Sequence, residues 1–232
     1  MHVTPSPPEH PRSAAPGAAG FPSAGTVARA GLAGALAVLA CIAWLDAPLA
    51  VWVHQSGLPA HRLLLDLTYL PEIYAACAAL VLLLTPLRLA MRGARRRAER
   101  VLLAMSVSLA LASLLKEVLK VVFGRAWPET WIGGNLSLIQ NHYYAFRWFQ
   151  FSHAYQSFPS GHTSLAFGAM SVLWLACPRL RWLAAAACLL PAAGLLGMDY
   201  HFLGDLLAGA LLGSACGVYV WGAARGLEDR RA

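Results

Sequence analysis

Charged side chains are scarce in this chain. Only 12% of its 232 residues are Asp, Glu, Lys or Arg, whereas 58% are hydrophobic, and the mean hydropathy is +0.55. A soluble domain of this size could not carry so many apolar side chains without exposing large patches of them. The composition therefore excludes an ordinary soluble protein and indicates an integral membrane protein.

Acidic residues are the scarcer of the two charge classes, with 11 Asp and Glu against 18 Lys and Arg and a net charge of +7. Excess positive charge can indicate nucleic-acid binding, but here most of it gathers in short connections between apolar segments and after the last one. Such clusters mark the cytoplasmic side of membrane proteins, and attraction to anionic lipids is the alternative. We therefore expect no nucleic-acid partner. The clustered residues are Arg88, Arg92, Arg95, Arg96, Arg97, Arg100, Arg179, Arg181, Arg225, Arg230 and Arg231.

Cysteine patterns that bind metals or form disulfide frameworks are also missing. The five cysteines all lie in apolar segments, at positions 41, 77, 177, 188 and 216, and no two have the spacing of a zinc site. They are expected to be small apolar packing residues. We predict neither a metal site nor a cofactor.

Apolar runs that can cross about 30 Å of hydrocarbon occur six times, at residues 28–45, 69–87, 101–123, 160–177, 183–198 and 201–223. They predict an all-α fold, a polytopic membrane bundle of six transmembrane helices, in one domain at 26–225. Residues 1–25 are rich in proline and are expected to be a disordered cytoplasmic tail, and 226–232 a short cytoplasmic tail. The first run is expected to be a retained helix, because little positive charge precedes it.

Three glycines in the last apolar run are spaced four residues apart, at Gly209, Gly213 and Gly217. This spacing lets a second helix approach closely. Packing inside the bundle is favoured over a dimer face, and no feature supports a homo-oligomer.

With both termini in the cytoplasm, the long connection 124–159 and the turn at Asp199 and Tyr200 lie on the outer side. The expected location is the cell inner (plasma) membrane, as a multi-pass protein with its active site facing outward. Aromatic residues of the kind found at headgroup interfaces fill the long connection, which is either a lid over a site or an interfacial anchor. They are Trp127, Trp131, Tyr143, Tyr144, Phe146, Trp148, Phe149 and Phe151.

Ionisable residues interrupt two of the apolar runs near their outer ends. Lys116 and Lys120 share a helix face, and Lys120 either serves a site or pairs with Glu117 three residues before it. His201 and Asp205 are four apart, so a helix would place them on one face. The carboxylate could then hold one imidazole nitrogen and leave the other as a nucleophile or base.

The segment 158–162, Phe-Pro-Ser-Gly-His, opens the fourth apolar run. Ser160 is a good helix cap, and the free backbone N–H groups from Gly161 onward would attract a phosphate. Capping explains Ser160 and Gly161 but leaves His162 without a reason.

Three motif regions together resemble the type-2 phosphatidic acid phosphatase and vanadium haloperoxidase superfamily, over roughly residues 30–224. The second motif, Pro-Ser-Gly-His at 159–162, is intact. In the first, the family has a lysine, six residues, then arginine and proline, and Lys120 and Pro128 match. In the third, His201 and Asp205 match.

The resemblance implies metal-independent phosphate transfer in two steps. His201 would attack phosphorus, Asp205 would orient it, and His162 would protonate the leaving oxygen. The phosphate oxygens would be stabilised by Lys120, Ser160 and the N–H of Gly161. A soluble haloperoxidase is disfavoured by the six spans.

Two arginines of the family pattern are absent. Trp127 stands at the arginine position of the first motif, and Gly194 and Leu195 replace the Ser-Arg pair of the third. Arg125 is the best substitute for phosphate binding, and Lys116, Arg147 and His153 are weaker ones. Trp127 would stack on a headgroup or, preferably, fill a notch in the loop. For Asp199, substrate amine binding, pairing with Arg125 and simple exposure stay open.

Three functions follow from these observations. The preferred one is a membrane phosphatase for a lipid phosphate or polyprenyl diphosphate, acting on the extracytoplasmic face through a phosphohistidine. The alternatives are a lipid-to-lipid phosphotransferase with the same site, and a catalytically weakened lipid-binding protein. The expected partners are the lipid substrate and the bilayer.

Overall fold

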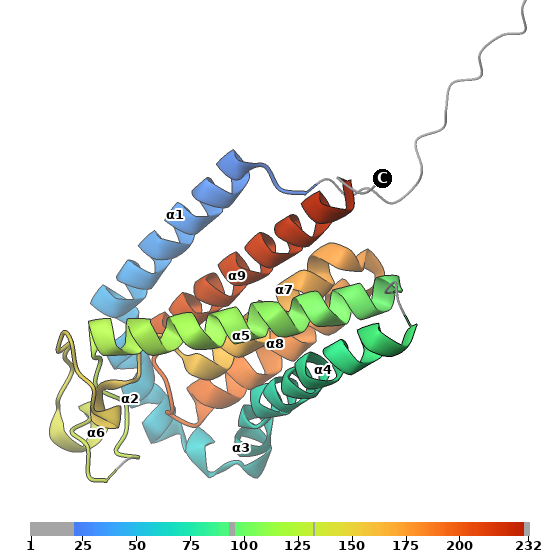
Figure 1. The fold of residues 1–232 in the computed structure, drawn as a ribbon. Coiled ribbons are helices and arrows are strands. Elements are labelled where there is room, and N and C mark those ends of the chain that lie inside the picture. The colour runs from blue at the N-terminus through green and yellow to red at the C-terminus, as the bar shows by residue number, and fades with distance from the viewer. Residues whose placement is uncertain (1–20, 93–95, 132, 230–232) are drawn as a thin grey trace, which may run out of the picture.

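The computed structural model describes residues 21–92, 96–131 and 133–229. It is a bundle of helices with one long loop at one end (Figure 1). The described residues include three isolated β-bridges and no strand. The predicted all-α membrane bundle is confirmed.

The first helical segment is longer than predicted. Helix α1 (Ala24–Ala40) continues through a π-helical turn at Cys41–Leu45 into α2 (Asp46–Ser56). The short α3 (Arg62–Thr68) was also not predicted. The remaining helices are α4 (Leu70–Arg92), α5 (Arg97–Phe123), α6 (Leu138–Asn141), α7 (Gly161–Ala176), α8 (Arg181–Gly197) and α9 (Leu203–Asp229).

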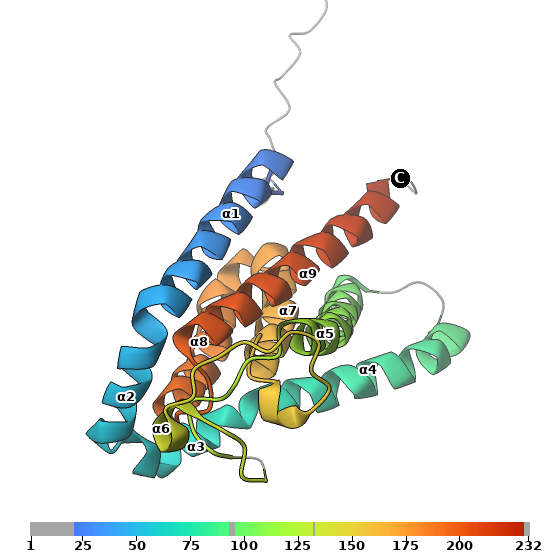
Figure 2. The same cartoon turned by 90° about the vertical axis from the view of Figure 1, so that its left-hand side faces the viewer.

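Five helical segments of the described chain are long and apolar enough to cross a membrane: Ala24–Ser56, Arg62–Arg88, Arg97–Phe123, Pro178–Gly197 and Leu203–Leu227. The predicted span at 160–177 is not among these five; it corresponds to α7, which has 16 residues and is therefore about 24 Å long. It packs against α4, α5, α8 and α9, in the middle of the bundle (Figure 2).

The predicted tails fall largely outside the described residues. Of the first tail, residues 1–20 are not described, and of the second, residues 230–232 are not. Arg95, Arg230 and Arg231 of the basic clusters lie outside as well. The described part of the second tail is helical, because α9 continues to Asp229.

The glycine series of α9 packs inside the bundle, as predicted. A Cβ at Gly209 would lie 2.6 Å from the carbonyl oxygen of Ser160, and one at Gly213 would lie 2.4 Å from that of Ser164. The backbones of α7 and α9 can approach this closely only because no side chain intervenes. The contact brings the start of α9 beside the start of α7.

The aromatic loop begins where α5 ends at Gly124. Gly124 has φ 51°, and a Cβ there would lie 1.7 Å from the carbonyl oxygen of Arg147. Only glycine allows this turn. The loop is seen beside α6 at the lower left of Figure 1, and the end of α4 and the start of α5 lie at the opposite end of the bundle.

Candidate active site

A cavity of about 340 Å³ lies where α5 ends and α7 and α9 begin. Three of the predicted site residues, Lys120, His162 and His201, line it although they come from three separate segments. The other lining residues are Trp127, Trp131, Leu195 and Tyr200. A cavity with two histidines and a lysine in its wall is chemically suited to phosphate transfer.

His201 is held from behind by Asp205 and Ser157. Its Nδ1 lies 3.5 Å from Asp205 Oδ2 and 3.5 Å from Ser157 Oγ. Ser157 Oγ also donates to Asp205 Oδ2 at 2.6 Å. With Nδ1 turned toward these partners, Nε2 is the nitrogen left for the cavity, as the spacing of the two residues predicted.

The environment of His201 favours the neutral, nucleophilic imidazole. The residue is 4% exposed, and burial lowers the pKa of His201 below its ordinary value, although Asp205 acts in the opposite direction. A neutral imidazole keeps the lone pair that an attack on phosphorus requires.

His162 stands across the cavity in the first turn of α7. Its Nε2 lies 3.6 Å from Glu72 Oε1 of α4, a carboxylate that the sequence did not single out. Glu72 is the carboxylate of α4 nearest to this imidazole. His162 therefore stands opposite His201, at the place where a proton donor to a leaving oxygen would be needed.

Ser160 and Gly161 shape the mouth of α7. Ser160 Oγ accepts from the Thr163 N–H, so Ser160 caps the helix as predicted. Its backbone N–H donates to the Asp205 carbonyl oxygen at 3.0 Å, which ties α7 to α9. A Cβ at Gly161 would lie 3.2 Å from Lys116 Cδ and 3.5 Å from Lys120 Nζ, so both lysines lie beside the helix N-terminus.

Glu117 pairs with Lys116 rather than with Lys120. Lys116 Nζ donates to Glu117 Oε1, and the predicted alternative of a Glu117–Lys120 pair is not observed. Lys120 instead lines the cavity. It supplies the cavity wall with a positive charge.

Arg125 does not face the cavity. Its Nη1 donates to Asp205 Oδ1 at 2.6 Å, and its Nη2 donates to Asp46 Oδ2 at 2.7 Å and to the Tyr144 hydroxyl at 2.6 Å. The side chain is 1% exposed. The expectation of a direct phosphate contact by Arg125 is therefore corrected, because its guanidinium is already engaged behind Asp205.

A model of the PAP2 superfamily matches residues 101–227, more than half of the chain. The chain belongs to the PAP2 superfamily. Comparisons with curated proteins and with solved structures found no match. Members of the superfamily are phosphatases, which assigns phosphoric ester hydrolysis in general to this membrane-embedded chain.

Packed residues occupy the positions at which the motif comparison expects two arginines. The ring of Trp127 lies 5.1 Å from that of His201, and its Nε1 donates to the carbonyl oxygen of His153 at 2.9 Å. Leu195 lines the cavity. A Cβ at Gly194 would lie 2.6 Å from the carbonyl oxygen of Leu64 in α3, so the helix that the sequence did not reveal leaves no space for serine there.

The aromatic loop of this PAP2 chain serves two surfaces. Trp127 and Trp131 line the cavity, whereas Trp148, Phe149 and Phe151 are 57%, 68% and 81% exposed. Trp127 and Trp131 therefore form part of the cavity wall, whereas the three exposed rings are free to lie in a headgroup interface. The lid and anchor hypotheses therefore apply to different residues of the same loop.

Asp199 is neither exposed nor paired with Arg125. It is 2% exposed, and its Oδ2 finds no hydrogen-bond donor in the described part of the chain. His54 Nδ1 is 3.6 Å from Oδ2. Burial, followed by the charge of Glu129, raises the pKa of Asp199 from 3.8 to about 7.

Asp199→Asn is expected to stabilise the protein above pH 7. Because the folded pKa is raised, the folded state holds the proton more tightly than the unfolded chain, and Asp199 destabilises the fold as the pH rises from about 4 to 7. Asparagine also tolerates the φ of 54° at this position. The unfolding temperature in detergent should rise more at pH 8 than at pH 4, with the exposed Asp66→Asn as control; a pH-independent change would contradict this assignment.

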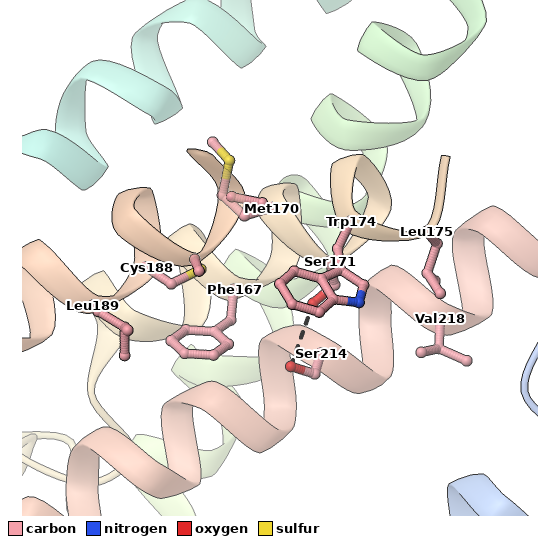
Figure 3. Close-up of a pocket in the computed structure, with 11 residues that line it drawn as sticks. Phe167, Met170, Ser171, Trp174, Leu175, Cys188, Leu189, Ser214 and Val218 are labelled. Carbon is pink, nitrogen blue, oxygen red and sulfur yellow. Dashed lines mark hydrogen bonds between the residues drawn. The ribbon is translucent and has the colours of Figure 1, made fainter. Parts of the chain in front are cut away.

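A second cavity, also about 340 Å³, lies between α7, α8 and α9 (Figure 3). Phe167, Trp174 and Leu189 are among its lining residues, and a hydrogen bond of 3.3 Å joins Ser171 Oγ to Ser214 Oγ. The residues of α7 that line this second cavity come after His162, starting at Phe167. Among the lining residues, Cys188 is the only one with an ionisable side chain. It is unsuited to phosphate chemistry.

Sequence reasoning did not predict that Asp46, Tyr144 and Ser157 belong to the site. Asp46 and Tyr144 accept hydrogen bonds from Arg125, and Ser157 donates one to Asp205. Asp46 gave a usable signal, because a lone carboxylate in an apolar run is a candidate for a functional site. Ser157 and Tyr144 gave none, since such residues are common in loops. Asp46 lies outside the residues that match the PAP2 model.

Proposed function

We propose that this protein is a metal-independent lipid phosphate phosphatase that forms a phosphohistidine on His201. The observation that carries the proposal is the meeting of Lys120, His162 and His201 in one cavity, with the Nδ1 side of His201 held by Asp205 and Ser157. This arrangement supplies a nucleophile, an acid and a cation in one place.

In the first step, Nε2 of His201 attacks phosphorus. An N–P bond forms, the ester P–O bond breaks, and the protonated imidazole of His162 gives its proton to the leaving oxygen. Lys120 and the N–H groups at the start of α7 stabilise the negative charge on the phosphate oxygens.

In the second step, water replaces the histidine. The now neutral His162 takes a proton from the water, whose oxygen attacks phosphorus, and the N–P bond breaks. Inorganic phosphate leaves and His201 returns to its starting form, so each proton lent by His162 is regained.

A lipid substrate is supported by the walls of the cavity and by its place in the bundle. Trp127, Trp131 and Leu195 offer apolar surface beside the two histidines. The cavity lies at the end of helices that are long enough to cross a membrane. A phosphate group at the headgroup level could enter there while its hydrocarbon chains stay in the bilayer.

The outward orientation is supported by the direction of the helices. Arg97 begins α5 and Lys120 lies near its other end, so a 27-residue helix of about 40 Å separates the basic connection from the site. Arg181 and Arg225 likewise stand at the helix ends remote from the cavity. With basic residues on the cytoplasmic side, the site faces away from the cytoplasm.

The test is release of inorganic phosphate by the purified protein in detergent. Phosphatidate, phosphatidylglycerol phosphate and a polyprenyl diphosphate are the substrates, and glycerol 3-phosphate is the matched substrate without a lipid chain. We expect release from at least one lipid in the presence of EDTA and much less from glycerol 3-phosphate.

Failure to release phosphate from every lipid would contradict a hydrolase. Transfer of labelled phosphate from a donor lipid to an acceptor lipid would then indicate the phosphotransferase, and absence of both activities the lipid-binding protein. Loss of activity in EDTA would contradict the metal-independent mechanism.

A further inference from the structure

A buried triad of charges lies directly behind the His201–Asp205 pair. Arg125 donates from Nη1 to Asp205 and from Nη2 to Asp46, at 2.6 Å and 2.7 Å. The side chains of the three residues are 0–1% exposed. Asp46 comes from α2, Arg125 from the aromatic loop and Asp205 from α9, so the triad joins three distant segments.

Asp46 is fixed by a second contact as well. Its Oδ1 accepts from the Gly204 N–H at 2.8 Å, one residue before Asp205 in α9. A Cβ at Gly204 would lie 2.6 Å from Asp46 Oδ2, so the close approach requires glycine at this position. Asp46 therefore touches both the start of α9 and the arginine that binds Asp205.

Aromatic rings enclose the guanidinium. The Arg125 Cζ lies 4.3 Å from the ring centre of Phe202, 4.9 Å from that of Phe146 and 5.1 Å from that of Tyr144. Ring faces attract a cation and keep water out. Charges in such surroundings interact strongly, because there is little solvent to screen them.

The charge count explains why a second carboxylate is needed. Arg125 alone would cancel the negative charge of Asp205, and the carboxylate could then do little for a positive charge that develops on His201. With Asp46 the triad carries one positive and two negative charges, a net charge of −1. The negative charge beside His201 is thereby preserved.

We propose that Asp46 is a positioning residue of the catalytic site, which acts through Arg125 to keep Asp205 in place and effectively negative toward His201. The inference rests on the proposed function in that His201 is the nucleophile. The proposal adds Asp46, a residue of the first helical segment, to the site. Asp46 lies outside residues 101–227, which match the PAP2 superfamily.

The test compares Asp46→Asn, Arg125→Gln and the double variant. Asp46→Asn changes the net charge of the triad from −1 to zero, and Arg125→Gln changes it to −2. The double variant restores the net charge of −1. We expect each single variant to lower kcat by roughly tenfold or more, the rate equivalent of one pKa unit, with little change in KM. The double variant should be faster than either single variant, and the exposed Asp66→Asn should match the wild type.

A double variant no faster than the slower single variant would overturn the proposal, because it would mean that the triad only supports the fold. Unfolding temperatures in detergent identify folded variants. If one single variant fails to fold, the kcat of the double variant is compared with that of the other single variant. A double variant that is no faster than this single variant overturns the proposal.

A readout without turnover separates this inference from the proposed function. The other ionisable groups facing His201 are Lys120 of α5 and His162 of α7. In 13C-histidine NMR, with His201→Gln for assignment, Asp46→Asn should lower the measured pKa of His201 because one negative charge is lost. An unchanged pKa overturns the inference, even in a preparation that releases no phosphate.

Discussion

His201→Ala is expected to abolish phosphate release, with a fall in kcat of about 1,000-fold or more, since the variant loses its covalent nucleophile. No second residue can take over the attack from the same position. His162 stands across the cavity with its Nε2 3.6 Å from Glu72, and Lys120 forms no ion pair with a carboxylate in the described part of the chain to match the His201–Asp205 pair. Phosphate release from the preferred lipid is the measurement.

Trapping the intermediate gives the same prediction a second readout. Wild-type protein quenched during turnover of 32P-labelled lipid should carry acid-labile label, and His201→Ala should carry none. His61→Ala is the matched control, because His61 is exposed and its side chain makes no cap hydrogen bond. More than a tenth of wild-type activity in His201→Ala would exclude His201 as the nucleophile.

Gly213→Val is expected to destabilise the protein severely. A Cβ at Gly213 would lie 2.4 Å from the Ser164 carbonyl oxygen and 2.6 Å from the Gly168 nitrogen, and neither backbone atom can move alone. Overpacking costs about 1–3 kcal/mol and occasionally more, and a clash with two backbone atoms belongs at the upper end of that range. This cost exceeds the gain of up to about 1 kcal/mol from replacing a helical glycine. Separation of α7 from α9 would also move His201 away from His162, so activity should fall together with the unfolding temperature.

Gly226→Val is the matched control for this substitution. It places the same side chain in the same helix, and a Cβ there meets nothing within 4 Å. The unfolding temperature in detergent should fall for Gly213→Val and stay near the wild-type value for Gly226→Val. Equal temperatures, with loss of a dimer in Gly213→Val, would favour the alternative that the glycines form a dimer face.

Long apolar runs predicted the helices well because membrane insertion depends on local hydropathy. Residues 101–123 became α5 with a four-residue extension at its start. The prediction failed where the hydropathy is interrupted, at Asp46 and Pro48, and α2 was missed although the helix continues there through a π-helical turn. The interruption is a functional feature in our proposal, since Asp46 binds Arg125.

Motif spacing predicted part of the site. The four-residue interval between His201 and Asp205 predicts one helix face, and the pair is found 3.5 Å apart, although His201 itself precedes α9. The same reasoning failed for Arg125, whose place two residues before Trp127, in the same turn, predicts a phosphate contact that the structure does not show. Its burial depends on Asp46, Tyr144 and Phe202, which no local pattern connects with it.

The sequence alone determined that this chain is a helical membrane protein and singled out Lys120, His162, His201 and Asp205 as candidate site residues, because hydropathy and motif spacing are local properties. Only the tertiary structure decided the partners of the charges. Arg125 joins Asp46 and Asp205, Glu117 takes Lys116, and Asp199 is buried. The physical reason is that burial and pairing depend on which helices meet: the contact between Asp46 and Gly204 spans 158 residues of chain.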